Sequence, residues 1–81
     1  MSERNTNNYK PLKELPIEIK IIDLLRAQEK SVYWLAKNSM ISQYALGQII
    51  KGKTTYIRFE VLANICNALK CDISDIIKIK S

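Results

Sequence analysis

Two short segments with the apolar pattern of helices, joined by a turn of three residues, constrain the fold of this chain most. Ser31 is a suitable N-cap for the first segment and predicts a helix over residues 31–38. Ser42 is a suitable N-cap for the second segment, whose helix continues to about residue 51. Gly52 follows directly, and glycine commonly ends a helix. The sequence therefore predicts two short helices around a tight turn.

The apolar residues of these two segments keep a register that predicts how the helices pack. Ile41 follows Ala36 by five residues, and Leu46 and Ile49 follow it by ten and thirteen. Two short helices that cross steeply need a small residue where they touch and branched residues where they share a core. Ala36 fits the crossing point, and the three larger residues fit the shared core.

Three further helices are predicted on either side of this pair. Pro16 suits the first position of a helix, and apolar residues recur at helical spacing from there to about Gln28. Apolar residues three and four positions apart, from Phe59 to Leu69, mark a fourth helix. Residues 72–75 have the form of a capping box and predict a short fifth helix.

Length and composition suit one compact all-α domain. The chain has 81 residues, of which 47% are hydrophobic, and only two glycines and two prolines. This is enough apolar material for a core, although small domains bury proportionally less surface. We place the domain at residues 16–81 and treat residues 1–15 as a polar N-terminal arm.

The residue types exclude most catalytic chemistry. The chain has no histidine, and its two cysteines are not spaced as a CxxC pair, which excludes a zinc site and a histidine-based triad. We therefore expect no enzyme, no metal and no cofactor. No apolar run reaches the ~20 residues that span a bilayer, and the polar start does not resemble a signal peptide. We expect a cytoplasmic protein.

The net charge of +5 is concentrated in one part of the chain. Residues 1–29 and residues 59–81 are each neutral, whereas residues 30–58 contain no carboxylate. A polyanion that approaches this stretch gains free energy from counterion release and meets no like charge. An ordinary solvated basic surface is the alternative interpretation, and a membrane surface fits less well. The cations are Lys30, Lys37, Lys51, Lys53 and Arg58.

The polar face of the third predicted helix has the chemistry of a base-reading surface. At 100° per residue, its polar side chains fall within an arc of about 140°, and the opposite half is apolar. Gln43 and Gln48 lie on this arc, and a glutamine can bond an adenine edge with two hydrogen bonds in the major groove. Gly47 also lies there. Glycine is unfavourable inside a helix, so it suggests close approach of another molecule.

At this point the sequence resembles the helix-turn-helix of the Cro and phage-repressor (XRE-like) family. The resemblance extends over roughly residues 17–77. It rests on Leu35-Ala36, Ile41-Ser42, Leu46, Ile49, Gly52, the stretch from Lys53 to Arg58, Leu62-Ala63-Asn64-Ile65-Cys66-Asn67-Ala68-Leu69 and Cys71-Asp72-Ile73.

The resemblance implies a compact five-helix lambda-repressor-like domain whose recognition helix enters the major groove of duplex DNA. It implies that Gln43, Tyr44 and Gln48 face bases and that Ser42 meets phosphates at the helix N-terminus. It also implies that the DNA backbone or the adjoining minor groove is lined by Lys51, Lys53, Thr54 and Arg58. The implied DNA-binding residues are Ser42, Gln43, Tyr44, Gly47, Gln48, Lys51, Lys53, Thr54 and Arg58. Two positions depart from the family pattern, because Val32 stands where glutamine is common and Met40 where glycine is common.

From these features we expect a transcriptional regulator that binds double-stranded DNA. We expect a repressor that acts as a homodimer on a two-fold related operator, a small switch protein of a phage or mobile element. Ile79 is the best candidate for a dimer contact. The alternative is an antitoxin or another protein-interaction module with the same fold. Trp34 is expected to pack against residues 9–15, and Ile73, Ile76 and Ile77 are expected in the core.

Overall fold

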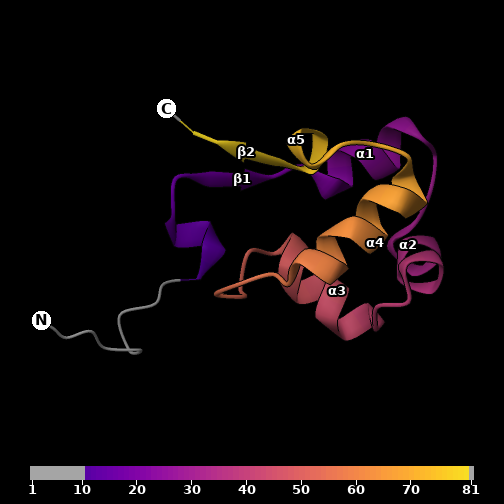
Figure 1. The fold of residues 1–81 in the computed structure, drawn as a ribbon, viewed down its shortest axis with the longest axis horizontal. Coiled ribbons are helices and arrows are strands. Elements are labelled where there is room, and N and C mark those ends of the chain that lie inside the picture. The colour runs from indigo at the N-terminus through magenta and orange to yellow at the C-terminus, as the bar shows by residue number, and fades with distance from the viewer. Residues whose placement is uncertain (1–10, 81) are drawn as a thin grey trace, which may run out of the picture.

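The computed structural model describes residues 11–80, and in this range it has five α-helices and a two-stranded antiparallel sheet (Figure 1). The five helices confirm the predicted architecture, but the sheet means that the domain is not strictly all-α. No helix in this range is long and apolar enough to cross a membrane. The elements are the 3-10 turn η2 (Leu12–Glu14), β1 (Ile17–Ile19), α1 (Ile21–Ala27), α2 (Val32–Ser39), α3 (Gln43–Ile50), α4 (Phe59–Leu69), α5 (Ile73–Ile76) and β2 (Ile77–Ile79).

The prediction of a helix from residue 16 is wrong at its start. Residues 17–19 form β1, which pairs antiparallel with β2 (Figure 1). The register of this pair places Glu18 opposite Lys78. The backbone N–H of Lys80 donates to the carbonyl oxygen of Pro16 at 2.8 Å and extends this pairing. Ile17 and Ile21 are four residues apart, which suits a helix, but Ile17 and Ile19 are two apart, which suits a strand. Pairing with a distant segment decides between the two.

Side-chain caps begin the helices where the sequence predicts them. The Ser31 hydroxyl oxygen accepts a hydrogen bond from the backbone N–H of Trp34 at 3.0 Å and begins α2. The Ser42 hydroxyl oxygen accepts one from Ala45 at 3.0 Å and begins α3. The capping box predicted from residues 72–75 is present before α5. These caps confirm the predicted helix starts because each depends on residues close in sequence.

Four helices end with a residue of positive φ followed by a backbone hydrogen bond that spans five residues. Such endings satisfy carbonyl groups that the last helical turn leaves free. Three of the positive-φ residues are not glycine, although a side chain in this conformation costs ~1–2 kcal/mol. The residues are Glu29, Met40, Gly52 and Lys70, and the bonds run from Lys30 to Leu25, Ile41 to Ala36, Lys53 to Gln48 and Cys71 to Cys66.

Met40 has the left-handed conformation expected at the turn between α2 and α3, with φ 61°. Its side chain is 90% exposed and so contributes nothing to the core. We expect Met40→Gly to raise the free energy of unfolding by up to ~1 kcal/mol, because relief of backbone strain exceeds the entropy cost of glycine. Urea denaturation measures this. Met40→Ala, which keeps the strain, serves as control, and a loss of several kcal/mol in Met40→Gly would contradict the prediction.

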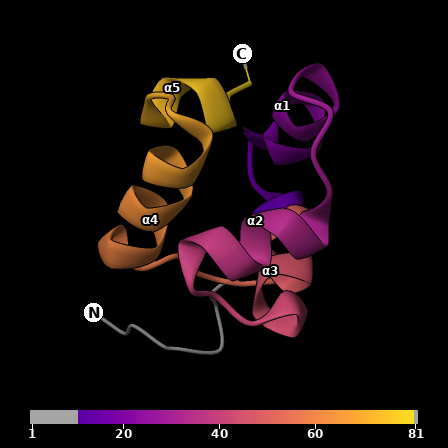
Figure 2. The same ribbon diagram turned by 90° about the vertical axis from the view of Figure 1, so that its right-hand side faces the viewer.

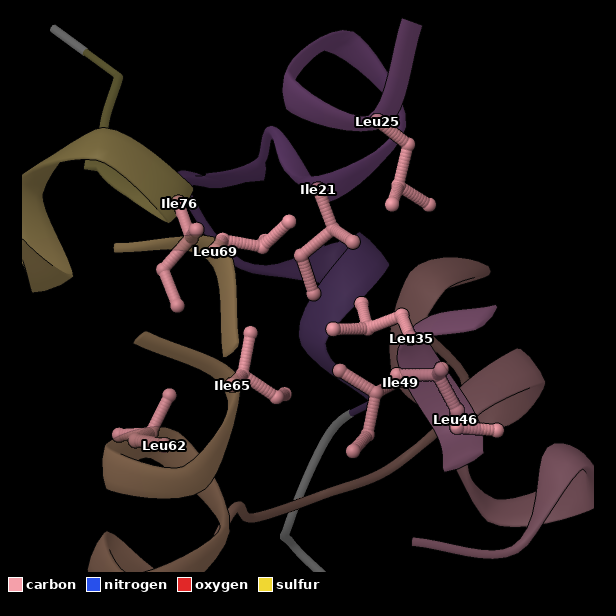
Figure 3. Packing of buried hydrophobic residues seen from close by; sticks show 10 residues of the cluster. Ile21, Leu25, Leu35, Leu46, Ile49, Leu62, Ile65, Leu69 and Ile76 are labelled. Atoms are coloured by element: carbon pink, nitrogen blue, oxygen red, sulfur yellow. The ribbon is translucent and has the colours of Figure 1, made fainter. Parts of the chain in front are cut away.

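The core lies between all five helices, as Figure 3 shows for its largest members. Ala36 is buried together with Leu46 and Ile49, in agreement with the predicted crossing of α2 and α3. Of the three isoleucines expected in the core near the end of the chain, Ile76 is fully buried and Ile77 packs at the margin. Ile73 is half exposed. The buried hydrophobic residues are Ile21, Leu25, Leu35, Ala36, Leu46, Ile49, Leu62, Ile65, Leu69 and Ile76.

The two cysteines meet at the end of α4 as free thiols. The positive-φ residue Lys70 turns the chain so that Cys66 and Cys71 line the same hollow. Burial raises the pKa of Cys66, and burial and the neighbouring thiol raise the pKa of Cys71 to about 11. At neutral pH both therefore remain protonated, and they act as packing residues rather than as thiolate nucleophiles.

Candidate nucleic-acid interface

α2 and α3 form the helix pair that the sequence predicts, with α2 lying across α3 (Figure 2). Leu46 and Ile49 hold the inner face of α3 against the core. The opposite face is open, and Gln43 and Tyr44 are exposed at its beginning. Because the inner face fixes the rotation of the helix, the polar arc predicted from the sequence points outward.

One edge of this polar arc borders a groove between α3, the loop of residues 51–58 and the first turn of α4. The groove has a volume of about 460 Å³. Five of the nine predicted DNA-binding residues line it, and apolar side chains form part of its wall. The five are Tyr44, Gln48, Lys53, Thr54 and Arg58, and the apolar residues are Ala45, Ile49, Ile57 and Val61.

Gln43 does not belong to this groove. It lines a separate shallow hollow of about 280 Å³, together with Tyr33 and Lys37 of α2. Lys51 is exposed at the other end of the polar arc and lines neither hollow. The predicted residues thus form a surface along the whole outer face of α3, with Gln43 at one end and Lys51 at the other.

Gly47 lies on the same outer face, one turn after Gln43. A Cβ atom added to it would have no described protein atom within 4 Å outside its own helix backbone and its chain neighbours. No close contact in residues 11–80 therefore requires a glycine here. Glycine inside a helix costs roughly 1 kcal/mol relative to alanine. The open backbone at Gly47 permits close approach of another molecule.

Two hydroxyl groups of the predicted site are arranged differently. The Ser42 hydroxyl is engaged as the cap of α3 and remains exposed. The Thr54 hydroxyl oxygen is buried and has no hydrogen-bond partner among the described residues. A contact from the Thr54 hydroxyl to a phosphate therefore requires a change of rotamer, whereas Ser42 is already accessible.

Arg58, which precedes α4, forms an exposed ion pair. Its guanidinium Nη2 lies 3.6 Å from Oε1 of Glu60, and the two side chains are 71% and 74% exposed. Exposed ion pairs contribute at most about 1 kcal/mol. The guanidinium can therefore exchange this carboxylate for a phosphate at little cost.

Tyr33 and Lys37 of α2 were not among the residues predicted to bind DNA. Both are exposed and share the hollow of Gln43. The sequence signal for Lys37 is that it belongs to the stretch without carboxylates. Trp34, on the same helix, is half buried and packs at the margin of the core, and the Lys30 ammonium lies 3.9 Å from the centre of its ring. Tyr9, part of the segment expected to cover Trp34, lies outside the described residues.

One comparison with known proteins agrees with this geometry. Comparison with curated proteins and with solved structures gave no significant match. A sequence model of the Cro/C1-type HTH DNA-binding domain matches residues 20–81, which is most of the chain. The chain therefore belongs to the family of Cro/C1-type helix-turn-helix DNA-binding domains.

Proposed function

We propose that this protein is a sequence-specific transcriptional regulator that binds double-stranded DNA as a homodimer and represses by occupying a promoter. One observation carries the sequence-reading part of the proposal. Gly47 lies in the middle of the outer face of α3, and no close contact within the described protein requires a glycine there. A base pair or a phosphate that approaches the α3 backbone would account for it.

In this proposal α3 enters the major groove, as the recognition helix of such domains does. The side chains of Gln43, Tyr44 and Gln48 face base edges, and the glutamine amides can donate to and accept from adenine. Ser42, Lys51, Lys53, Thr54 and Arg58 contact the sugar-phosphate backbone, which fixes the position of α3 without reading the sequence.

The proposed dimer uses the end of the chain. Ile79 is 66% exposed on β2, beyond the last helix, where a second copy would cover its apolar side chain. Two recognition helices related by a two-fold axis read half-sites about one DNA turn, or ~34 Å, apart. A dimer formed in this way would prefer an inverted repeat.

The alternative is that the fold binds a protein, as an antitoxin or a partner-binding module does. The specific observation in its favour is the apolar wall of the groove beside α3, together with two exposed aromatic residues next to it. Tyr56 is 72% exposed and Phe59 87% exposed. Such residues are enriched in protein interfaces.

Selection of bound sequences from random duplex DNA tests both proposals. We expect enrichment of a short inverted repeat whose half-sites are centred about one helical turn apart, and a protein-DNA complex with the mass of two chains. Enriched sites without inverted symmetry, bound by one chain, would contradict the dimer but retain DNA reading. No enrichment at all would favour the protein-interaction alternative.

A further inference from the structure

Residues 11–19 lie before the part of the chain that the family model matches, yet they are fixed against the end of α3. The backbone N–H of Lys13, in η2, donates to the carbonyl oxygen of Gly52 at 2.9 Å. On the other side, β1 is paired with β2. The segment is therefore held at two points, and Lys13 has a defined place beside the end of α3.

Gly52 makes this contact feasible. It has φ 70°, and a Cβ atom added to it would lie 2.9 Å from Cβ and 3.0 Å from N of Lys13. A side chain at this position would therefore push Lys13 away. Gly52 both ends α3 and leaves room for the main chain of η2 to approach.

The approach of η2 collects positive charge around a hollow of about 180 Å³. Lys13, Lys51 and Lys80 line it, and Glu18 is the one carboxylate among its lining residues. The three lysines are exposed, and none of them forms an ion pair with a carboxylate in residues 11–80. The cluster thus keeps a positive excess, and Lys51 joins it directly to the polar arc of α3.

We infer that Lys13, Lys51 and Lys80 form a phosphate-binding cluster, which holds the DNA backbone next to the half-site that α3 reads. This inference rests on the proposed function. It assigns to residues before the matched family domain a role in gripping DNA, and it requires the contact between Lys13 and Gly52. Because ammonium groups that contact phosphates carry no sequence information, the cluster contributes affinity and salt dependence rather than base preference.

The test is a titration of the full-length protein with a duplex that carries its selected site, at several salt concentrations. Each phosphate contact contributes about −0.9 to the slope of log affinity against log salt. We expect Lys13→Gln to reduce the slope by about this amount per bound chain, so that between 50 and 200 mM salt its deficit relative to wild type shrinks about 3.5-fold for each bound chain, or about 12-fold for a dimer. Base preferences remain unchanged.

Lys70→Gln is the matched control. It removes the same charge at the far end of α4, beside Asp72 and Asp75 and away from η2 (Figure 1), and should change the slope little. Lys13→Arg, which retains the charge and the backbone contact, should keep the wild-type slope even if Lys13→Gln alters folding. Equal slopes for Lys13→Gln and Lys70→Gln would overturn the cluster. A wild-type slope near zero would overturn the proposed function itself.

Discussion

Gly47→Ala is expected to make the free protein more stable and its DNA complex weaker. A Cβ atom at this position meets no described protein atom within 4 Å apart from the local helix backbone and chain neighbours. Alanine should therefore raise the free energy of unfolding by about 0.5–1 kcal/mol, which is the usual gain inside a helix. If a base or phosphate approaches the α3 backbone there, the added methyl displaces it. We expect roughly tenfold weaker binding or more, the size of one lost base contact.

Denaturant unfolding and a binding titration with the selected site measure the two effects separately. Gly52→Ala is the informative contrast, because Gly52 has a left-handed backbone and is crowded by Lys13, whereas Gly47 has neither feature. The Gly52 backbone has φ 70°, and the added Cβ would lie 2.9 Å from Cβ of Lys13. It should lower the free energy of unfolding by at least ~1–2 kcal/mol. If Gly47→Ala stabilises the protein and leaves DNA affinity unchanged, no DNA atom approaches this glycine.

The sequence could predict where several of the helices begin and where the chain turns. Helix ends depend on neighbouring residues, so Ser31, Ser42 and the capping box before α5 were predicted correctly. The turn around Met40 was also predicted from the sequence, and the glycine common at this position in the family agrees with its left-handed conformation.

The start of the domain could not be predicted in the same way. Ile17 satisfies both a helical and a strand pattern, and its pairing with residues about sixty positions later decides between them. No local pattern contains that information. The division of the chain into an arm of residues 1–15 and a domain of residues 16–81 stays a prediction, since residues 1–10 lie outside the described range. The described part of the arm, however, contacts Gly52 through Lys13.

The candidate site shows the same distinction between local and distant information. Helical periodicity predicted the polar arc of α3, and the buried positions of Leu46 and Ile49 agree with it. Periodicity could not show that Gln43 and Lys37 share one hollow, or that Gln48 lines a different groove. This neighbourhood depends on how α2 crosses α3. The direct role of each side chain in binding DNA stays a prediction.

Substitutions of Gln43 and Lys53 are expected to separate sequence reading from general affinity. The Gln43 side chain is exposed and uncharged, so we expect it to contribute hydrogen bonds to particular base edges, worth ~1–3 kcal/mol of discrimination. Lys53 follows α3 in an exposed loop and borders the groove, where an ammonium group meets phosphates. Gln43→Ala should relax the preference at one or two base positions and hardly change the salt slope. Lys53→Ala should weaken all sequences alike and reduce the slope by about one per subunit.

Repeating the DNA selection and the salt titration with each variant measures both quantities. Asn67→Ala removes an exposed amide near the far end of α4 and is the control for Gln43→Ala, and Lys70→Ala is the control for Lys53→Ala. Neither control should change base preference. If Gln43→Ala and Lys53→Ala both weaken binding uniformly, α3 does not read bases through Gln43. If neither substitution affects DNA binding but Tyr56→Ala, which removes an exposed aromatic side chain from the groove, abolishes binding of a protein partner, the groove beside α3 serves protein recognition, and the family fold is used here without its reading function.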